Sequence, residues 1–222
     1  MQIEKKQIAY NRVARSGAIK YIVIHDTGNK SKGADADSHF RYFNGGNRNS
    51  SADFFVDDKT VLQVNDYTKY YTWHVGDGKG KYGITNQNSV GIEICVNADG
   101  NYDGAYAKAA ELTKYLMKQL GIGAERVVRH YDASRKNCPA SMSANNWALW
   151  EKFKRLIKEE IKMAECKFTD ISGHYGEKQI REVFEMGIMN GVDETHFEPD
   201  KPVTRAQAAI IARNVVRYIT GK

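Results

Sequence analysis

The fold is decided by the stretch Tyr21-Ile22-Val23-Ile24-His25, in which an apolar run leads directly into a histidine. A run of this length predicts a buried β-strand, and the polar turn Asp26-Thr27-Gly28-Asn29 ends it. A histidine at the end of a buried strand is well placed to take part in a functional site.

A second strand is predicted over residues 89–96, where apolar and other residues alternate. One face of this strand carries Val90, Ile92, Ile94 and Val96, and the other carries Gly91, Glu93 and Cys95. Glu93 therefore points away from the aliphatic face. Cys95 is predicted to be a small packing residue without chemistry of its own.

Apolar residues at helical spacing predict helices before and after the second strand in the sequence. Ala36, His39, Phe40 and Phe43 predict one helix, in which His39 is expected to pack half-buried, and residues 54–56 and 61–64 predict a hairpin. Apolar positions over 105–120 and 147–161 predict two further helices, the second extending to about Met163 and packing through Trp147 and Trp150. The pattern predicts an α/β domain with a mixed central β-sheet flanked by helices.

The chain length of 222 residues suits one well-cored domain and a small appendage. Turn residues and a new helical pattern begin at Phe168. We therefore predict a catalytic domain over 1–163, a short linker over 164–167, and a small all-α repeat domain over 168–222.

A net charge of +6 favours anionic partners: nucleic acid, anionic lipid or wall polymers. Lysine and arginine are scattered rather than grouped with aromatic residues, which argues against nucleic acid. No run approaches the length of a membrane span, and residues 1–7 lack the apolar core of a signal peptide, which predicts synthesis in the cytoplasm. The three widely spaced cysteines argue against a disulfide framework.

His25, His130 and Cys138 are of the residue types that zinc prefers. A catalytic zinc keeps three protein ligands and one open position, so these three residues would suffice. Their spacing is not one of the closely spaced zinc-finger patterns, and isolated core or surface residues remain the alternative. The stretch between His130 and Cys138 is polar and is predicted to be a loop.

Four segments together resemble one known family: Tyr21–Gly28, Thr72–Gly76, Val90–Cys95 and Arg129–Pro139. In this order they are similar to the N-acetylmuramoyl-L-alanine amidases of phage endolysins and prophage autolysins, a family that includes the peptidoglycan-recognition proteins. The resemblance covers nearly all of residues 1–162. It implies hydrolysis of the amide between N-acetylmuramic acid and L-alanine in peptidoglycan, leading to wall lysis.

The resemblance also implies roles for individual residues. It implies zinc (Zn²⁺) on His25, His130 and Cys138, a catalytic acid/base at Glu93 and a cationic helper for the developing oxyanion at Lys136. It further implies substrate contacts at Thr27, Trp73 and His74, with a structural histidine as the alternative at His74. One departure is Ser51-Ala52-Asp53-Phe54, where many relatives carry a tyrosine. A phenyl ring cannot donate a hydrogen bond, so Glu93 and Lys136 must act without a tyrosine.

The C-terminal segment resembles one surface-layer homology (SLH) repeat, a module that binds anionic secondary cell-wall polymers in Gram-positive bacteria. The resemblance rests on Phe168–Ile171, Gly187–Gly191, Phe197–Asp200 and Pro202–Gln207. It implies polymer contacts at Arg205, Asp170 and Tyr175, with hinge packing as the alternative for Tyr175. Thr204 and Gln207 predict a capping box at the start of the last helix.

A lone repeat buries little core, so we predict self-association through copies from other chains. A second translation start at Met163 would supply free repeats. Two other functions remain open: a peptidoglycan-binding module without catalysis, and a cytosolic amidase that recycles soluble muropeptides. For the lytic enzyme we expect a Gram-positive host and release to the wall through a holin, a separate membrane-permeabilising protein.

Overall fold

The computed structural model describes residues 1–158 and 166–220, and the contacts divide the chain into the units Met1–Lys158 and Glu159–Lys222. The predicted extension of the last helix of the first domain to Met163 and the start of the predicted linker lie outside the described residues. Within the described part of the chain, no helix has the length and apolar character needed to cross a bilayer.

The first unit is built on a mixed sheet of six strands in the order β1-β5-β4-β7-β3-β8. The strands are β1 (Glu4–Lys5), β3 (Tyr21–Asp26), β4 (Phe54–Val56), β5 (Val61–Gln63), β7 (Ser89–Ile94) and β8 (Val127–Arg129). Strands β4, β7, β3 and β8 run parallel to one another, and β4 and β5 form the predicted antiparallel hairpin. A second, two-stranded sheet pairs β2 (Arg12–Ala14) with β6 (Tyr70–Thr72).

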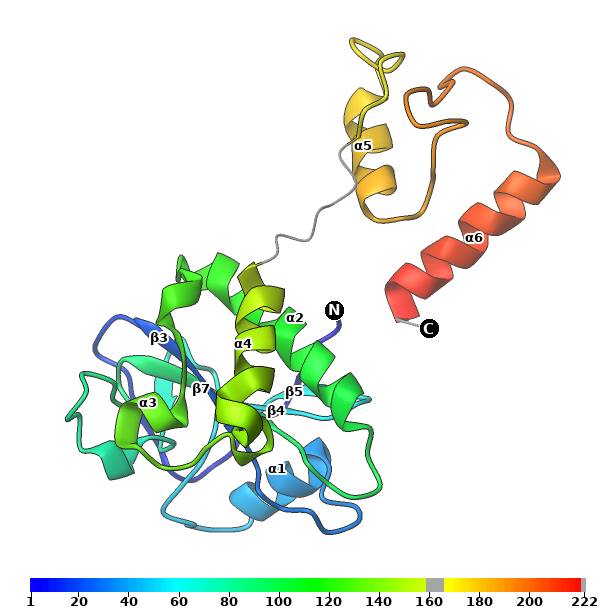
Figure 1. The fold of residues 1–222 in the computed structure, drawn as a ribbon. Helices are drawn as coiled ribbons and strands as arrows, with labels where there is room; N and C mark the ends of the chain where they lie inside the picture. The colour runs from blue at the N-terminus through cyan, green and yellow to red at the C-terminus, as the bar shows by residue number, and fades with distance from the viewer. Residues whose placement is uncertain (159–165, 221–222) are drawn as a thin grey trace. The chain divides into compact units, whose positions relative to one another are not determined.

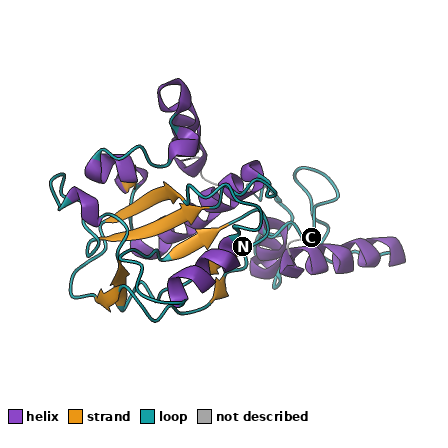
Figure 2. Cartoon of the chain, turned by 90° about the horizontal axis from the view of Figure 1, so that it is seen from below, coloured by secondary structure: helices purple, strands orange, loops and turns teal. Residues whose placement is uncertain are grey.

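One face of the large sheet is covered by two helices, α2 (Tyr102–Leu120) and α4 (Ala144–Lys158), as Figures 1 and 2 show. Val90, Ile92 and Ile94, which were predicted to share a face of β7, pack here with Ile22 and Ile24 of β3 against α2 and α4 and form the main core. The prediction of an aliphatic face on the second strand is therefore confirmed. The strand itself ends at Ile94 rather than at Val96.

The opposite face is only partly covered by a helix. Helix α1 (Ala36–Asn44) packs over β4 and β5, and His39 in it is buried and stacks on Phe55 with ring centroids 5.2 Å apart. Beside α1, the loop that follows β6 and the short helix α3 (His130–Ser134) pack against Val23.

The second unit contains α5 (Glu177–Glu185) and α6 (Arg205–Thr220), which confirms the all-α expectation. Its small core joins Phe168, Ile171 and Ile180. The predicted capping box is present, because Thr204 N–H donates to Gln207 Oε1 at 2.9 Å and Gln207 N–H donates to Thr204 Oγ1 at 3.2 Å. Most side chains of α6 are exposed.

The stability of the first unit should depend on Phe153 of α4, which is fully buried against Tyr106 and Trp150. Phe153→Ala leaves a cavity in the main core, so we expect a loss of about 3–5 kcal/mol in the free energy of unfolding. Denaturant unfolding of the full chain, followed through the transition of this unit, measures it. Tyr10→Ala, at an exposed position, is the control and should change the value by less than about 0.5 kcal/mol.

Candidate metal centre and active site

Three neighbouring parallel strands bring the central residues of the site into one row. His25 of β3 lies opposite Glu93 of β7, and Ile24 lies opposite Arg129 of β8, so His130 follows directly beside His25. The carboxyl ends of parallel strands meet at one edge of the sheet. Residues from three distant parts of the sequence therefore become neighbours through backbone pairing alone.

Cys138 lies close to His25 and His130 because the chain turns back after α3. The stretch after His130 was predicted to be a loop, which is wrong for its first part, because residues 130–134 form α3. The Asp132 carboxylate accepts the backbone N–H of Arg129 at 2.9 Å and stabilises this helical turn. Tyr131 N–H then donates to the Cys138 carbonyl at 2.9 Å, which draws the cysteine back to the site.

His25, His130 and Cys138 are buried, and one ligand atom from each lies within 4.8 Å of the others. Nδ1 of His25 is 3.1 Å from Nδ1 of His130 and 3.8 Å from Sγ of Cys138. Two nitrogen ligands of a tetrahedral zinc lie about 3.4 Å apart, and a nitrogen and a sulfur about 3.6 Å apart. The donor set and its spacing therefore fit zinc.

The far nitrogens of both imidazoles are held by protein groups. Nε2 of His25 lies 3.0 Å from Nδ1 of His74, and Nε2 of His130 lies 2.7 Å from the Asp77 carboxylate. Burial and the neighbouring positive charges lower the pKa of His25 well below its usual value, and burial lowers the pKa of His74 to about 3. The rings are therefore neutral near pH 7, as metal ligands must be.

Glu93 lies beside the ligand atoms, with Oε1 3.9 Å from Nδ1 of His25. Among the described residues, its Oε2 and the hydroxyl of Thr27 are buried atoms without a hydrogen-bond partner. Burial, with a smaller contribution from the nearby Asp26 carboxylate, raises the pKa of Glu93 to about 8, whereas Lys136 opposes that shift. An orphaned carboxylate oxygen next to a metal-binding set is suited to proton transfer.

The other predicted site residues lie at different depths. Lys136 is exposed, and its charge acts on His25, His130 and Glu93. Trp73 is half-buried, whereas His74 is buried behind His25 and offers little surface to a substrate.

The three residues predicted to contact a wall polymer belong to the second unit. Tyr175 is 92% exposed, and Arg205 is exposed at the first position of α6. The carboxylate of Asp170 accepts backbone N–H groups of Phe197 and Glu198 at 2.7–3.0 Å, which fixes a loop of the repeat.

The sequence did not predict a role in the site for Asp77 or Ser89. Asp77 follows the segment Thr72–Gly76 that marked the family resemblance, and its place directly after that segment was the available signal. Ser89 opens the predicted strand, and its hydroxyl lies 3.2 Å from Nε2 of His74. Nothing in the sequence pattern pointed to a role for that hydroxyl.

The centre of β7 is anchored by a buried carboxylate. Asp53 is fully buried and accepts the Gly91 N–H at 2.8 Å and the Asn65 side-chain amide at 2.7 Å. Phe54, the residue that departs from the expected tyrosine, lies in the main core. The segment from Ser51 to Phe54 therefore supports the strand that carries Glu93.

Residues 15–141 match the family described as N-acetylmuramoyl-L-alanine amidase. The chain belongs to this family. The amidase CwlH of Bacillus subtilis is 40% identical over 132 residues, which are 60% of this chain and 52% of that protein. The amidase XlyA of the same species is 38% identical over 146 residues, 66% of this chain and 46% of that protein. This amidase chain thus spans about half the length of these curated relatives.

Solved structures agree on the amidase fold. The catalytic domain of XlyA superposes with a TM-score of 0.63 at 37% identity, covering 71% of this chain and 99% of that one. PlyL superposes with a TM-score of 0.61 at 29% identity, covering 71% and 97%. The predicted mixed sheet with flanking helices is therefore confirmed for this amidase, and residues 167–209 match the S-layer homology domain, which confirms the predicted repeat.

Because burial raises the pKa of Asp53 to about 6, this carboxyl makes stability depend on pH. The folded protein keeps the proton up to about pH 6, whereas the unfolded chain releases it near pH 4, so the carboxyl's contribution to stability falls as pH rises through that window. For Asp53→Asn, we expect the free energy of unfolding relative to wild type to increase by on the order of 3 kcal/mol between about pH 4 and about pH 7.

Denaturant unfolding at several pH values measures this difference. Asp103→Asn, an exposed carboxyl in the first turn of α2, is the matched control and should follow the wild-type profile. Parallel profiles for wild type and Asp53→Asn would contradict the assignment.

Proposed function

We propose that this protein is a zinc-dependent amidase that hydrolyses the bond between N-acetylmuramic acid and L-alanine in peptidoglycan and so lyses bacterial walls. The observation that carries the proposal is the convergence of two imidazole nitrogens and one sulfur next to Glu93, whose Oε2 is buried without a hydrogen-bond partner. The membership of the chain in the amidase family supports the same reaction.

Each residue of the site has a task in amide hydrolysis. Zinc, when bound by His25, His130 and Cys138, supplies a Lewis acid that polarises the carbonyl and acidifies water. Glu93 takes the proton of the attacking water and passes it to the departing alanine nitrogen, for which its raised pKa suits it. Lys136 stabilises the negative charge that develops on the carbonyl oxygen. No tyrosine is needed in this scheme.

Two further residues are proposed to contact the substrate. The Thr27 hydroxyl is buried without a partner directly after β3, so it can donate to or accept from a bound muropeptide. Trp73 is half-buried beside the loop that contains His74, and its indole can pack on a sugar or a stem peptide.

The two alternatives fit the residues less well. A binding module without catalysis has no use for a complete ligand set beside a carboxylate that has one buried oxygen without a hydrogen-bond partner. A recycling amidase acting on soluble muropeptides has no use for a wall-binding repeat, and residues 167–209 match such a repeat. The lytic enzyme accounts for both units.

For the repeat, we propose that Arg205 and Tyr175 bind an anionic secondary wall polymer. An exposed guanidinium at the start of a helix suits an anionic sugar, and the highly exposed Tyr175 ring can pack against a sugar face. Asp170 uses its carboxylate on backbone N–H groups, so we propose that it contributes by shaping the loop 193–198. Access to the wall from the cytoplasm through a holin, and a Gram-positive host, stay predictions of the sequence.

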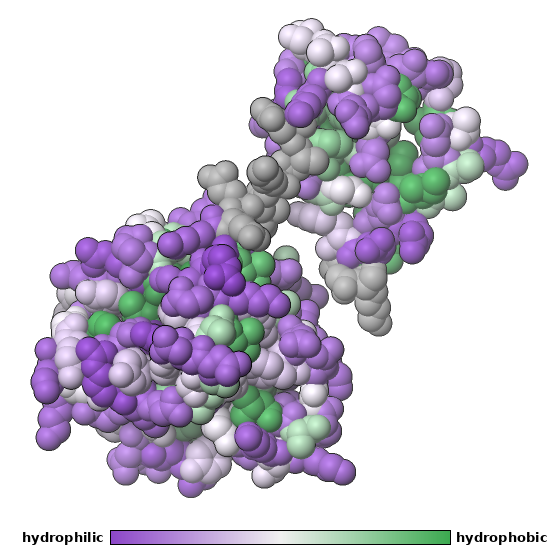
Figure 3. Space-filling model, viewed as in Figure 1, coloured by the Kyte–Doolittle hydropathy of each residue, from purple (hydrophilic) through white to green (hydrophobic). Residues whose placement is uncertain are grey.

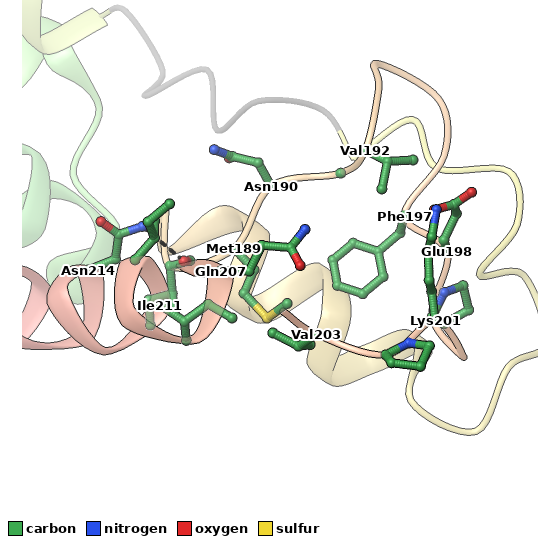
Figure 4. Close-up of a pocket in the computed structure, with 15 residues that line it drawn as sticks. Met189, Asn190, Val192, Phe197, Glu198, Lys201, Val203, Gln207, Ile211 and Asn214 are labelled. Atoms are coloured by element: carbon green, nitrogen blue, oxygen red, sulfur yellow. Dashed lines mark hydrogen bonds and ion pairs between the residues drawn. The ribbon is translucent and has the colours of Figure 1, made fainter. Parts of the chain in front are cut away.

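We further propose that the repeat self-associates. Val203 is 54% exposed and Ile210 is 57% exposed, and Figure 3 shows apolar side chains gathered on this unit. Near them is a pocket of about 280 Å³, lined by Met189, Phe197, Val203 and Ile211 among others (Figure 4). Most side chains of α6 are exposed, so packing against another copy would bury its exposed apolar residues and stabilise the repeat. The proposed second start at Met163 lies outside the described residues.

Purified walls give the decisive test of the reaction. Full-length protein with zinc should release new alanine amino termini without new reducing sugar ends. A strong chelator should abolish this release, and added zinc should restore it, because the metal supplies the Lewis acid. Release of reducing ends would indicate a glycosidase, and wall binding without any release would favour the binding module.

Glu93→Gln separates chemistry from metal binding in the same assay. The variant keeps the ligand set, so it should bind zinc like wild type while its turnover falls by about 10²–10⁴-fold.

Lys136→Met tests the cationic helper, and Lys158→Met, at an exposed lysine at the end of α4, is its control. Lys136→Met should lower turnover by about 10²–10³-fold and leave zinc affinity close to wild type, whereas the control should keep full turnover.

Self-association is tested by sedimentation of the full chain over a range of concentrations. We expect the mass to rise above one chain with increasing concentration. Ile210→Glu should shift the equilibrium back to the single chain, because it places a charge on the apolar surface of α6. Glu194→Lys, an exposed charge change in the loop of the repeat, is the control. A single-chain mass at every concentration would refute self-association.

A further inference from the structure

We propose that the segment His74–Gly78 is a positioning clamp, which sets the orientation and tautomer of both imidazole ligands. This inference rests on the proposed zinc site and deepens it. At one end of the segment, Nδ1 of His74 lies 3.0 Å from Nε2 of His25. At the other end, the Asp77 carboxylate lies 2.7 Å from Nε2 of His130. A single loop between β6 and β7 therefore contacts both imidazoles, one from β3 and one from the first residue of α3.

A backbone carbonyl fixes the direction of the hydrogen bonds at His74. Ser89 Oγ lies 2.5 Å from the Thr85 carbonyl, which can only accept, so the Ser89 hydroxyl donates to it. Nε2–H of His74 must then donate to Ser89 Oγ at 3.2 Å, which leaves Nδ1 of His74 as an acceptor. Nε2–H of His25 donates to that acceptor, and Nδ1 of His25 is left with a free lone pair.

The same logic applies to His130. The Asp77 carboxylate accepts the Nε2–H of His130 at 2.7 Å, so Nδ1 of His130 also keeps a free lone pair. The two Nδ1 atoms face each other at 3.1 Å, an arrangement that repels unless a cation lies between them. The clamp therefore prepares both rings as metal ligands before any metal binds.

The segment itself is held firmly in place. The Asn86 side-chain oxygen accepts the backbone N–H groups of His74 at 3.0 Å and of Val75 at 2.8 Å. Gly91 makes room for the His74 ring, because a Cβ there would lie 2.8 Å from the ring. At the other end, a Cβ on Gly78 would lie 2.2 Å from the Ala133 carbonyl of α3. The loop thus packs closely against β7 and against α3, which carries His130.

Zinc affinity of the full-length protein is the first readout, measured by competition with a chromophoric chelator. His74→Phe fills the space but removes both hydrogen bonds, and Asp77→Ala removes the carboxylate. We expect each variant to bind zinc about 10–100-fold more weakly than wild type, because outer partners of metal-binding histidines have effects of that size. His39→Phe and Glu111→Ala, a buried histidine and an exposed carboxylate outside the site, are matched controls and should bind zinc like wild type.

Conservative variants distinguish hydrogen bonding from packing. The Asn side-chain oxygen can replace the acceptor of His74 or of Asp77, so His74→Asn and Asp77→Asn should recover part of the lost affinity. In the metal-free protein, nitrogen-15 NMR of the imidazoles should show His25 and His130 as Nε2–H tautomers. This population should fall at His25 in His74→Phe and at His130 in Asp77→Ala.

Wall hydrolysis at saturating zinc completes the test. Because neither residue is proposed to touch the substrate, kcat should fall while KM stays close to wild type. The clamp would be overturned if His74→Phe and Asp77→Ala both kept wild-type zinc affinity. It would also be overturned if these variants lowered only the melting temperature and left the tautomers of His25 and His130 unchanged. If the wild-type protein binds zinc but releases no alanine amino termini, the proposed function fails while the clamp remains supported.

Discussion

The parallel pairing of β3 with β7 on one side and β8 on the other is the constraint on which the site depends. Register sets His25 opposite Glu93, and it places His130 one step beyond the end of β8. A slip of one residue in either pairing would turn the affected side chain to the opposite face of the sheet. The buried aliphatic residues of the same strands oppose such a slip, since they would then leave the core. Core packing and site geometry are therefore fixed by the same hydrogen bonds.

Much of this arrangement could be predicted from the sequence. The apolar run before His25 and the alternation around Glu93 each specify a strand and a face, because burial and the period of two are local properties. The helix ending at Gly121 was predictable for the same reason, and Gly121 has a φ of 63° there. Strand β8 was not predicted, since its three residues are too few to show a period.

The partners of the ligands were harder to predict. His74 was predicted to contact the substrate, with a structural histidine as the alternative. That its ring fills the space next to Gly91 is visible only in the tertiary structure. Asp77 and Ser89 act through single hydrogen bonds across the fold, and such contacts leave no periodic trace in the sequence. The helical turn α3 was mistaken for a loop because polar residues form it, and its stability comes from the Asp132 cap.

The proposed metal ligands also bear on the stability of the first unit. His25 and Cys138 are 113 positions apart in the chain, and His130 directly follows β8. A metal held by all three would tie the first central strand to the last part of the sheet, much as a crosslink closes a long loop. Metal that binds the folded unit better than the open chain adds to its stability in proportion to the logarithm of its concentration. The lifetime of the folded unit would then follow the zinc supply of its surroundings.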